Sequence, residues 1–150
     1  MALPGVAVTA TEDLEGAIRA ADMVACATAA TAPLVKGAWL KAGAHLDLIG
    51  AYTHEMRESD DDCVRRARVF VDSPKHALDR CGDISQPIET GLLRAEDIVA
   101  DLFELAGGEK HGRASDSEIT LFKNAGGGHQ DLGCAQLLER RLQGGGRQGP

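Results

Sequence analysis

The sequence predicts a single α/β domain, and three observations support this fold class. Short apolar runs typical of buried strands alternate with segments of helical periodicity, which is the pattern of parallel βαβ units. Aromatic residues make up only 3% of the 150 residues, whereas glycine and alanine are plentiful. This composition favours α/β packing over an aromatic-rich β-sandwich. The length corresponds to one domain that can bury a sizeable core.

Five runs have the composition of strands. The first, 6–8, is short and predicts an edge strand. Residues 23–27 are continuously apolar, as expected of a strand buried on both faces of a sheet. A second buried strand is predicted at 46–49, and two more follow at 69–72 and 118–123.

Helical segments separate these runs. Thr11 is predicted to cap a helix over 12–21, because acidic residues follow it and suit the positive end of a helix. Ser59 with an aspartate three residues on has the spacing of a capping box, which predicts a short helix. Two more helices are expected at 95–106 and at about 130–142. A less regular segment lies before 95, with Pro87 as a breaker, and residues 143–150 are expected to form a flexible tail.

The charge and cysteine content exclude several classes of protein. Sixteen basic and 23 acidic residues give a formal charge of −7, which argues against binding to a nucleic-acid backbone. The four cysteines show no CxxC spacing, which predicts reduced thiols in a cytoplasmic protein and no metal site. We therefore expect no signal peptide and no membrane span, since no apolar run approaches the roughly 18 residues that a span needs.

Three turns that follow predicted strands are candidates for a ligand site. In an open α/β sheet, ligands bind at the carboxyl ends of the strands. Gly50–His54 is interpreted as the rim of such a site. Thr28–Pro33 has small side chains that let a ligand approach the backbone, although it also fits a plain tight connection. The glycines 126–128 fit either a cofactor-admitting turn or a mobile one.

Few side chains near these turns can donate a proton at neutral pH. The candidates are Tyr52, His54 and His129, although each also fits a solvated turn residue. The acidic run 58–62 fits a metal site or, more simply, a solvated helix start. Lys36 and Lys123 are expected at the surface, with anion binding as the alternative. The residues alone predict an α/β domain with a ligand edge built from three turns.

Several blocks taken together resemble the ornithine cyclodeaminase/mu-crystallin family in order and spacing. The blocks in the first half are Ala21–Val24, Thr28–Pro33, Gly43–Ala51, Met56–Asp60 and Ala67–Asp72. Those in the second half are Gly82–Asp83, Gly112–Arg113, Ser115–Asp116, Ile119–Asn124 and Gln130–Leu132. The resemblance covers nearly everything from about residue 6 to 140.

This resemblance implies a Rossmann-type domain that binds NAD(H) or NADP(H), and the sequence leaves the choice between them open. The common chemistry of the family is hydride transfer between nicotinamide and the α-carbon of an amino or imino acid. The positions that match the cofactor-contacting turns are Thr28, Ala29, Ile49, Gly50, Ala51, Asn124 and Gly126. We therefore expect the cofactor-binding half of an oxidoreductase acting on cyclic imino or amino acids, similar to pyrroline-2-carboxylate or ketimine reductases.

One departure from the family concerns the reaction. In the cyclodeaminases an aspartate follows the Gly-Ala pair, whereas Tyr52 stands here and cannot act as a carboxylate. Imine reduction with Tyr52 as the catalytic residue is therefore expected over ornithine cyclodeamination. The alternatives left open are a cyclodeaminase that converts ornithine to proline and ammonia, and a non-catalytic truncated binding module.

A second departure concerns extent. Residues 1–142 resemble a partial Rossmann domain that lacks its first βαβ unit, together with a C-terminal helix. The glycine fingerprint and the substrate domain of the family do not match any part of the chain. We expect weak cofactor binding and no turnover by the chain alone. The expected partners are a small imino or amino acid and either a second copy or an upstream half, with no nucleic acid and no membrane.

Overall fold

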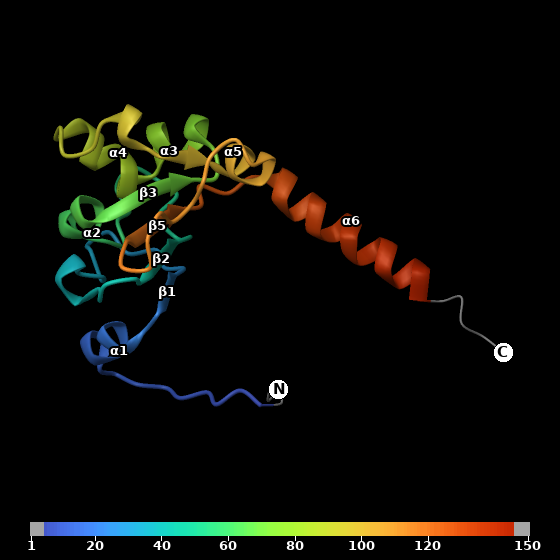
Figure 1. The fold of residues 1–150 in the computed structure, drawn as a ribbon, viewed down its shortest axis with the longest axis horizontal. Helices are drawn as coiled ribbons and strands as arrows, with labels where there is room; N and C mark the ends of the chain where they lie inside the picture. The colour runs from blue at the N-terminus through green and yellow to red at the C-terminus, as the bar shows by residue number, and fades with distance from the viewer. Residues whose placement is uncertain (1–4, 146–150) are drawn as a thin grey trace.

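The computed structural model describes residues 5–145, which form a five-stranded, fully parallel sheet and six α-helices (Figure 1). The strand order is β1-β2-β5-β3-β4, so β5, which comes last in the chain, lies between β2 and β3. The strands are β1 (Met23–Cys26), β2 (His45–Leu48), β3 (Ala67–Val71), β4 (Ala100–Asp101) and β5 (Ile119–Lys123). This arrangement confirms the predicted α/β class with a parallel sheet.

Short helices with clear capping residues connect the strands. The α-helices are α1 (Leu14–Ala20), α2 (Asp61–Arg66), α3 (Pro74–Arg80), α4 (Gly82–Glu89), α5 (Leu102–Gly107) and α6 (Gly128–Gly145), with 3-10 turns η1 (Gly37–Trp39) and η2 (Ala95–Asp97). Asp13 caps α1 by accepting from the backbone of Gly16, and Asp60 caps α2 by accepting from Cys63. The predicted caps are therefore slightly misplaced: Thr11 lies two residues before the cap of α1, and Ser59 lies one residue before the cap of α2. In both helices it is the aspartate side chain that accepts a hydrogen bond from the first turn.

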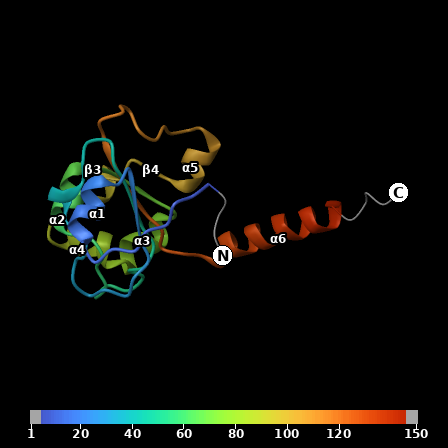
Figure 2. The ribbon, with the colours of Figure 1, turned by 90° about the horizontal axis from the view of Figure 1, so that it is seen from below.

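The core lies on one face of the sheet. Leu46, Leu48 and Leu121 are completely buried and pack against apolar residues of α1, α2, α4 and η1. We call this side the covered face. The alternate residues of the same strands point to the other side, which we call the open face; there His45 and Phe122 are only half-buried and Met23 is 73% exposed. Figure 2 shows the helices α1, α2 and α4 gathered on one side of the molecule.

Several predicted elements are corrected by the structure. Residues 6–8 form no strand, and both valines are exposed. The strand at 23–26 is not buried on both faces, because no element within the described residues covers β1 on the open face. Two helices, α3 and α4, occupy the segment expected to be irregular. Pro74 occupies the first turn of α3, where its missing N–H costs nothing, and Pro87 lies inside α4 rather than ending it.

The predicted helix over 95–106 is wrong in its first half. The structure has η2, the two-residue strand β4 beside β3, and only then α5. Asp101 and Glu104 form a capping box that begins α5 after the strand, so the apolar run at 98–100 is used for strand pairing instead.

The last helix, α6, is longer than predicted and projects away from the sheet (Figure 1). Its apolar side chains Leu132, Leu138 and Leu142 are more than half exposed. Residues 143–145, expected in the tail, belong to this helix, and the remainder of that tail lies outside the described residues. Among the helices that the structure describes, none is long and apolar enough to cross a membrane.

Candidate functional site

The turns after β1, β2 and β5 lie together at the carboxyl edge of the sheet, as the sequence predicts. Backbone hydrogen bonds continue the pairing past the strand ends. Ile49 N donates to Cys26 O at 2.8 Å, and Asn124 N donates to Leu48 O at 2.9 Å. The positions expected to contact a cofactor therefore come from three neighbouring turns.

Glu58 joins two of these turns and was not predicted as a site residue. Its carboxylate is completely buried and accepts hydrogen bonds from the backbone N–H and hydroxyl of Thr28, at 2.6 and 2.9 Å. The other carboxylate oxygen accepts from the backbone N–H groups of Gly50 and Ala51, at 2.8 and 3.3 Å. The prediction that this acidic run is a solvated helix start is therefore wrong for Glu58.

Gly50 permits the close approach of the two turns. A Cβ atom at this position would overlap the backbone nitrogen and oxygen of Thr28 and the carboxylate of Glu58. Only glycine can occupy this position without moving one of the turns. The glycine thus allows the two backbone segments to lie in direct contact at the centre of the edge, a role that the sequence did not predict.

Asp83 and Lys123 lie beneath Glu58. One oxygen of Asp83 accepts from the backbone N–H groups of Glu58 and Ser59, at 2.9 and 3.0 Å. Its other oxygen lies 3.5 Å from the ammonium of Lys123, and both side chains are completely buried. Burial raises the pKa of Asp83, and Lys123 and the two N–H donors oppose this rise. Lys123 is therefore not the surface lysine that the sequence predicts.

The turn after β5 is held by a different aspartate. Asp72 is buried and accepts from the backbone N–H of Gly126 at 3.0 Å and from the side chain of Gln130 at 3.2 Å. Asn124 also accepts from Gly126 N, at 2.8 Å. Gly126 has a φ of +80°, a conformation that glycine adopts readily. The turn is therefore ordered by two side chains rather than left as a loose glycine run.

Tyr52 lies next to this turn. It lines a cavity of about 290 Å³ together with residues of α3 and the 125–127 turn: His76, Arg80, Cys81, Ala125, Gly126 and Gly127. The tyrosine is 60% exposed. Two sequence-predicted residues, Tyr52 and Gly126, thus line one cavity. His76 and Arg80 were not predicted as site residues, because their helix was not predicted.

The other predicted candidates have varied surroundings. His54 shares a hydrogen bond with Ser85 at 2.9 Å and lies 3.5 Å from Glu89. It lines a different cavity, which it shares with Tyr52 and Arg80. The side chain of His129 lies outside the described part of the chain. Ala29 and Ile49 are exposed at the edge, as a cofactor contact requires. Lys36 stacks over Trp39 at 5.0 Å, and its cation is engaged there.

The cysteines are free thiols, as predicted, and Cys26, Cys63 and Cys81 are buried. Burial and the nearby carboxylates of Glu58 and Asp83 raise the pKa of Cys26 to about 11. Cys26 therefore stays protonated and unreactive at neutral pH. Among the described residues, no group of three or more His, Cys, Asp or Glu side chains is arranged to hold a metal ion.

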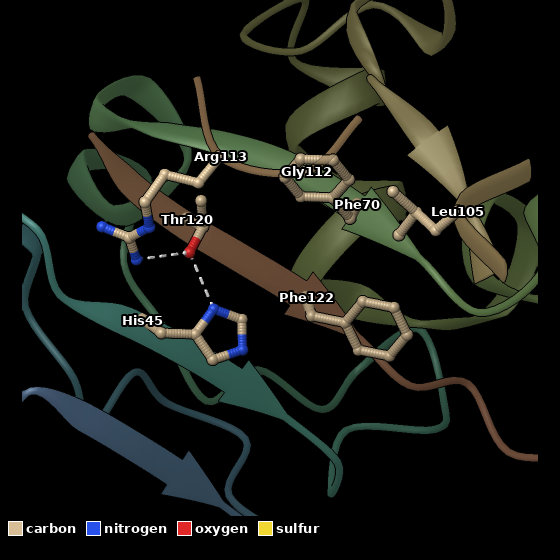
Figure 3. A pocket seen from close by; sticks show the side chains of 7 residues that line it. All are labelled: His45, Phe70, Leu105, Gly112, Arg113, Thr120 and Phe122. Carbon is tan, nitrogen blue, oxygen red and sulfur yellow. Dashed lines mark hydrogen bonds between the residues drawn. The ribbon is translucent and has the colours of Figure 1, made fainter. Parts of the chain in front are cut away.

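A second cavity, of about 270 Å³, lies on the open face (Figure 3). In it, Arg113 donates to Thr120 Oγ1 at 3.2 Å, and this hydroxyl lies 2.8 Å from His45 Nδ1. Arg113 also donates to the carbonyls of Gly43 and Glu118. The arginine is thus occupied by the backbone and is not poised for a ligand, and the cavity is away from the three turns.

Comparisons with known proteins agree with the geometry. The model of the ornithine cyclodeaminase/mu-crystallin family matches residues 1–146. The chain is 43% identical over 135 residues to a Delta(1)-pyrroline-2-carboxylate reductase of Paracoccus denitrificans, which covers 90% of this chain and 43% of that protein.

Two solved structures have the same fold. One is the Thermococcus litoralis Delta(1)-pyrroline-2-carboxylate reductase in complex with NADH and L-proline, with a TM-score of 0.80 and 36% identity over 87% of this chain. The other is an archaeal alanine dehydrogenase dimer with bound NAD, with a TM-score of 0.78 and 32% identity over 88%. The chain covers 41% of each of these two structures, less than half of their length. The chain belongs to the ornithine cyclodeaminase/mu-crystallin family.

Proposed function

We propose that this chain is the cofactor-binding half of an NAD(P)H-dependent oxidoreductase that acts on cyclic imino or amino acids, of the pyrroline-2-carboxylate or ketimine reductase kind. The observation that carries the proposal is the convergence of three strand-end turns, with Tyr52 and Gly126 lining one cavity beside them. A relative with this fold is a pyrroline-2-carboxylate reductase in complex with NADH and L-proline, which supports both the cofactor and the substrate class.

The edge suits a flat cofactor ring. Gly126 carries no side chain and has open space where a Cβ would lie, and Thr28 and Ala29 are small, so a ring can lie close to the backbone. In this proposal Thr28, Ala29, Ile49 and Gly50 form one wall, and Asn124 and Gly126 form the other. Ala51, which was also expected to contact the cofactor, is completely buried and lies behind the first wall. A nicotinamide bound there supplies the hydride that reduces the C=N carbon of the substrate.

Tyr52 is the proposed catalytic residue. Its hydroxyl donates the proton that the imine nitrogen needs as the carbon accepts the hydride, and the exposed phenolate recovers its proton from water. A tyrosine at this position lacks the carboxylate expected of a cyclodeaminase. Ornithine cyclodeamination therefore remains the less supported alternative.

The partner surface is the open face. Within the described residues no helix covers β1 and β2 there, and Met23 is 73% exposed. An upstream half or a second copy would complete the fold by covering this face, and the reactions above are proposed for the completed assembly. We further propose a cytoplasmic location, where the free thiols of the chain stay reduced.

Binding and turnover test the proposal directly. NADH and NADPH are titrated against the chain by fluorescence, alone and with the upstream half of a family member supplied in trans. We expect tighter binding with the added half, and nucleotide oxidation when pyrroline-2-carboxylate is added. No binding in either case would contradict the proposal and leave the family membership as a record of ancestry.

The role of Tyr52 is tested in the same assembly. Tyr52→Phe removes only the hydroxyl, so we expect imine reduction to fall by about 10²-fold or more, the usual contribution of a positioned proton donor. Nucleotide affinity should stay within about twofold of the parent, because the proposed contacts to the ring are backbone atoms. Unchanged turnover would exclude Tyr52 as the proton source.

A further inference from the structure

Glu58 is a buried anion that has no cation beside it. Within residues 5–145, no lysine, arginine or histidine lies within ion-pair distance of its carboxylate. Its charge is balanced instead by the three backbone N–H groups and one hydroxyl that the two turns donate to it. Asp83 holds the backbone of Glu58 in place through Glu58 N. The carboxylate is thus fixed, and the turns are arranged around it.

Peptide geometry converts this arrangement into a directed surface. All peptide bonds of the described residues are trans, so each carbonyl points opposite to the N–H of the next residue. Because Thr28, Gly50 and Ala51 direct their N–H groups inward to Glu58, the carbonyls of Ala27, Ile49 and Gly50 point outward. Among the described residues, no hydrogen bond ends on these three oxygens. Ala27 and Ile49 are exposed residues, which places this stretch of backbone at the surface of the edge.

We propose that Glu58 is a positioning residue that makes the cofactor-facing edge a rim of hydrogen-bond acceptors. Such a rim binds a ligand group that carries N–H or O–H donors, such as the carboxamide of a nicotinamide or a ribose hydroxyl. The same rim disfavours phosphate and carboxylate groups, because the N–H groups of Thr28, Gly50 and Ala51 are directed to Glu58. The identity of the ligand rests on the proposed function, whereas the direction of the carbonyls does not.

Glu58→Gln tests whether one carboxylate holds both turns. Glutamine has one acceptor oxygen, whereas each oxygen of Glu58 serves a different turn, and its NH₂ group would face an N–H donor. We expect the amide protons of one turn, either Thr28 or Gly50 with Ala51, to shift upfield in the ¹H–¹⁵N spectrum and to lose at least tenfold of their exchange protection. Glu55→Gln is the matched control, an exposed glutamate three residues earlier that leaves these amides unchanged.

A cofactor analogue tests the acceptor rim. The probes are NADH and its 3-acetylpyridine analogue, in which a methyl group replaces the carboxamide NH₂ and removes the donor. We expect the parent protein to bind NADH about tenfold more tightly than the analogue. In Glu58→Gln this preference should fall below about threefold, while Glu55→Gln keeps it.

The amide and nucleotide measurements distinguish an error in the proposed acceptor rim from an error in the proposed function. Equal binding of both nucleotides to the parent would overturn the acceptor rim and leave the proposed function standing. Absence of nucleotide binding even with the upstream half added would overturn the proposed function, and the amide shifts would still decide the role of Glu58. Unchanged amides of Thr28, Gly50 and Ala51 in Glu58→Gln would overturn the positioning role.

Discussion

The two faces of the sheet are built from alternate residues of the same strands, yet they have different surroundings. On the covered face, Leu46 and Leu121 are fully buried, and Lys123 shares that burial in an ion pair with Asp83. On the open face, His45 and Phe122 are half-buried beside a cavity. The difference teaches that the main apolar core lies on one face. On the other face Phe70 and Thr120 are buried, while the part formed by β1 and β2 is available for a further segment or subunit.

Among substitutions on the two faces, we expect the largest loss of stability at Lys123. Lys123→Met keeps the volume and removes the charge, so Asp83 is left as a buried carboxylate without its cation. We expect a loss of about 3–5 kcal/mol in the free energy of unfolding, measured by urea denaturation at pH 7. The double variant Lys123→Met/Asp83→Asn should recover most of this loss, because neither member of the pair is then left as a buried charge without its partner.

The pH dependence of this variant follows from the pKa of Asp83. That pKa is raised in the folded state, so the folded state holds the proton more tightly than the unfolded chain. The penalty of burying the carboxylate is absent below the ordinary value of 3.8 and grows as the pH rises through the folded value. Lys123→Met should therefore be least destabilised in acid. An equal loss at every pH would contradict the assigned ion pair.

Adjacent residues of β5 compare the two faces directly. Leu121 faces the covered side and Phe122 the open side. We expect Leu121→Ala to lower the free energy of unfolding by about 3 kcal/mol, within the range for buried leucines. Phe122→Ala should cost about 1 kcal/mol, because its ring is already partly in contact with water. If an upstream half or a second copy covers the open face, the loss at Phe122 should rise when that partner is added.

The smallest effect is expected at His45, the polar residue of the open face. Partial burial lowers the pKa of His45 below its ordinary value of 6.5. The folded state therefore binds this proton less tightly than the unfolded chain. The stability contribution is complete above pH 6.5 and is lost as the pH falls through the folded value. His45→Asn should flatten the fall of the melting temperature between pH 7 and 5, and an unchanged slope would contradict this assignment.

Individual residues show which structural features local sequence patterns can predict. The end of β5 contained a usable signal, since strand alternation places Lys123 on the same side as Leu121, but the charge of lysine favoured the surface. Pro74 likewise fits the first turn of a helix, and the apolar pattern around Pro87 was outweighed by the proline. The run at 98–100 fits both strand and helix, and only its pairing with β3 selects the strand.

The sequence by itself determined the α/β class, the four strands with long apolar runs and the three turns at the carboxyl edge. These features depend on local periodicity and on the general position of ligand sites in parallel sheets. Only the tertiary structure decided the roles of Glu58, Asp83 and Lys123. Glu58 binds Thr28 from thirty residues away, and Asp83 binds Ser59 from twenty-four. The strand order brings together partners that are far apart in the sequence. A local pattern therefore does not indicate that a charged residue will be buried or that it will orient the backbone around it.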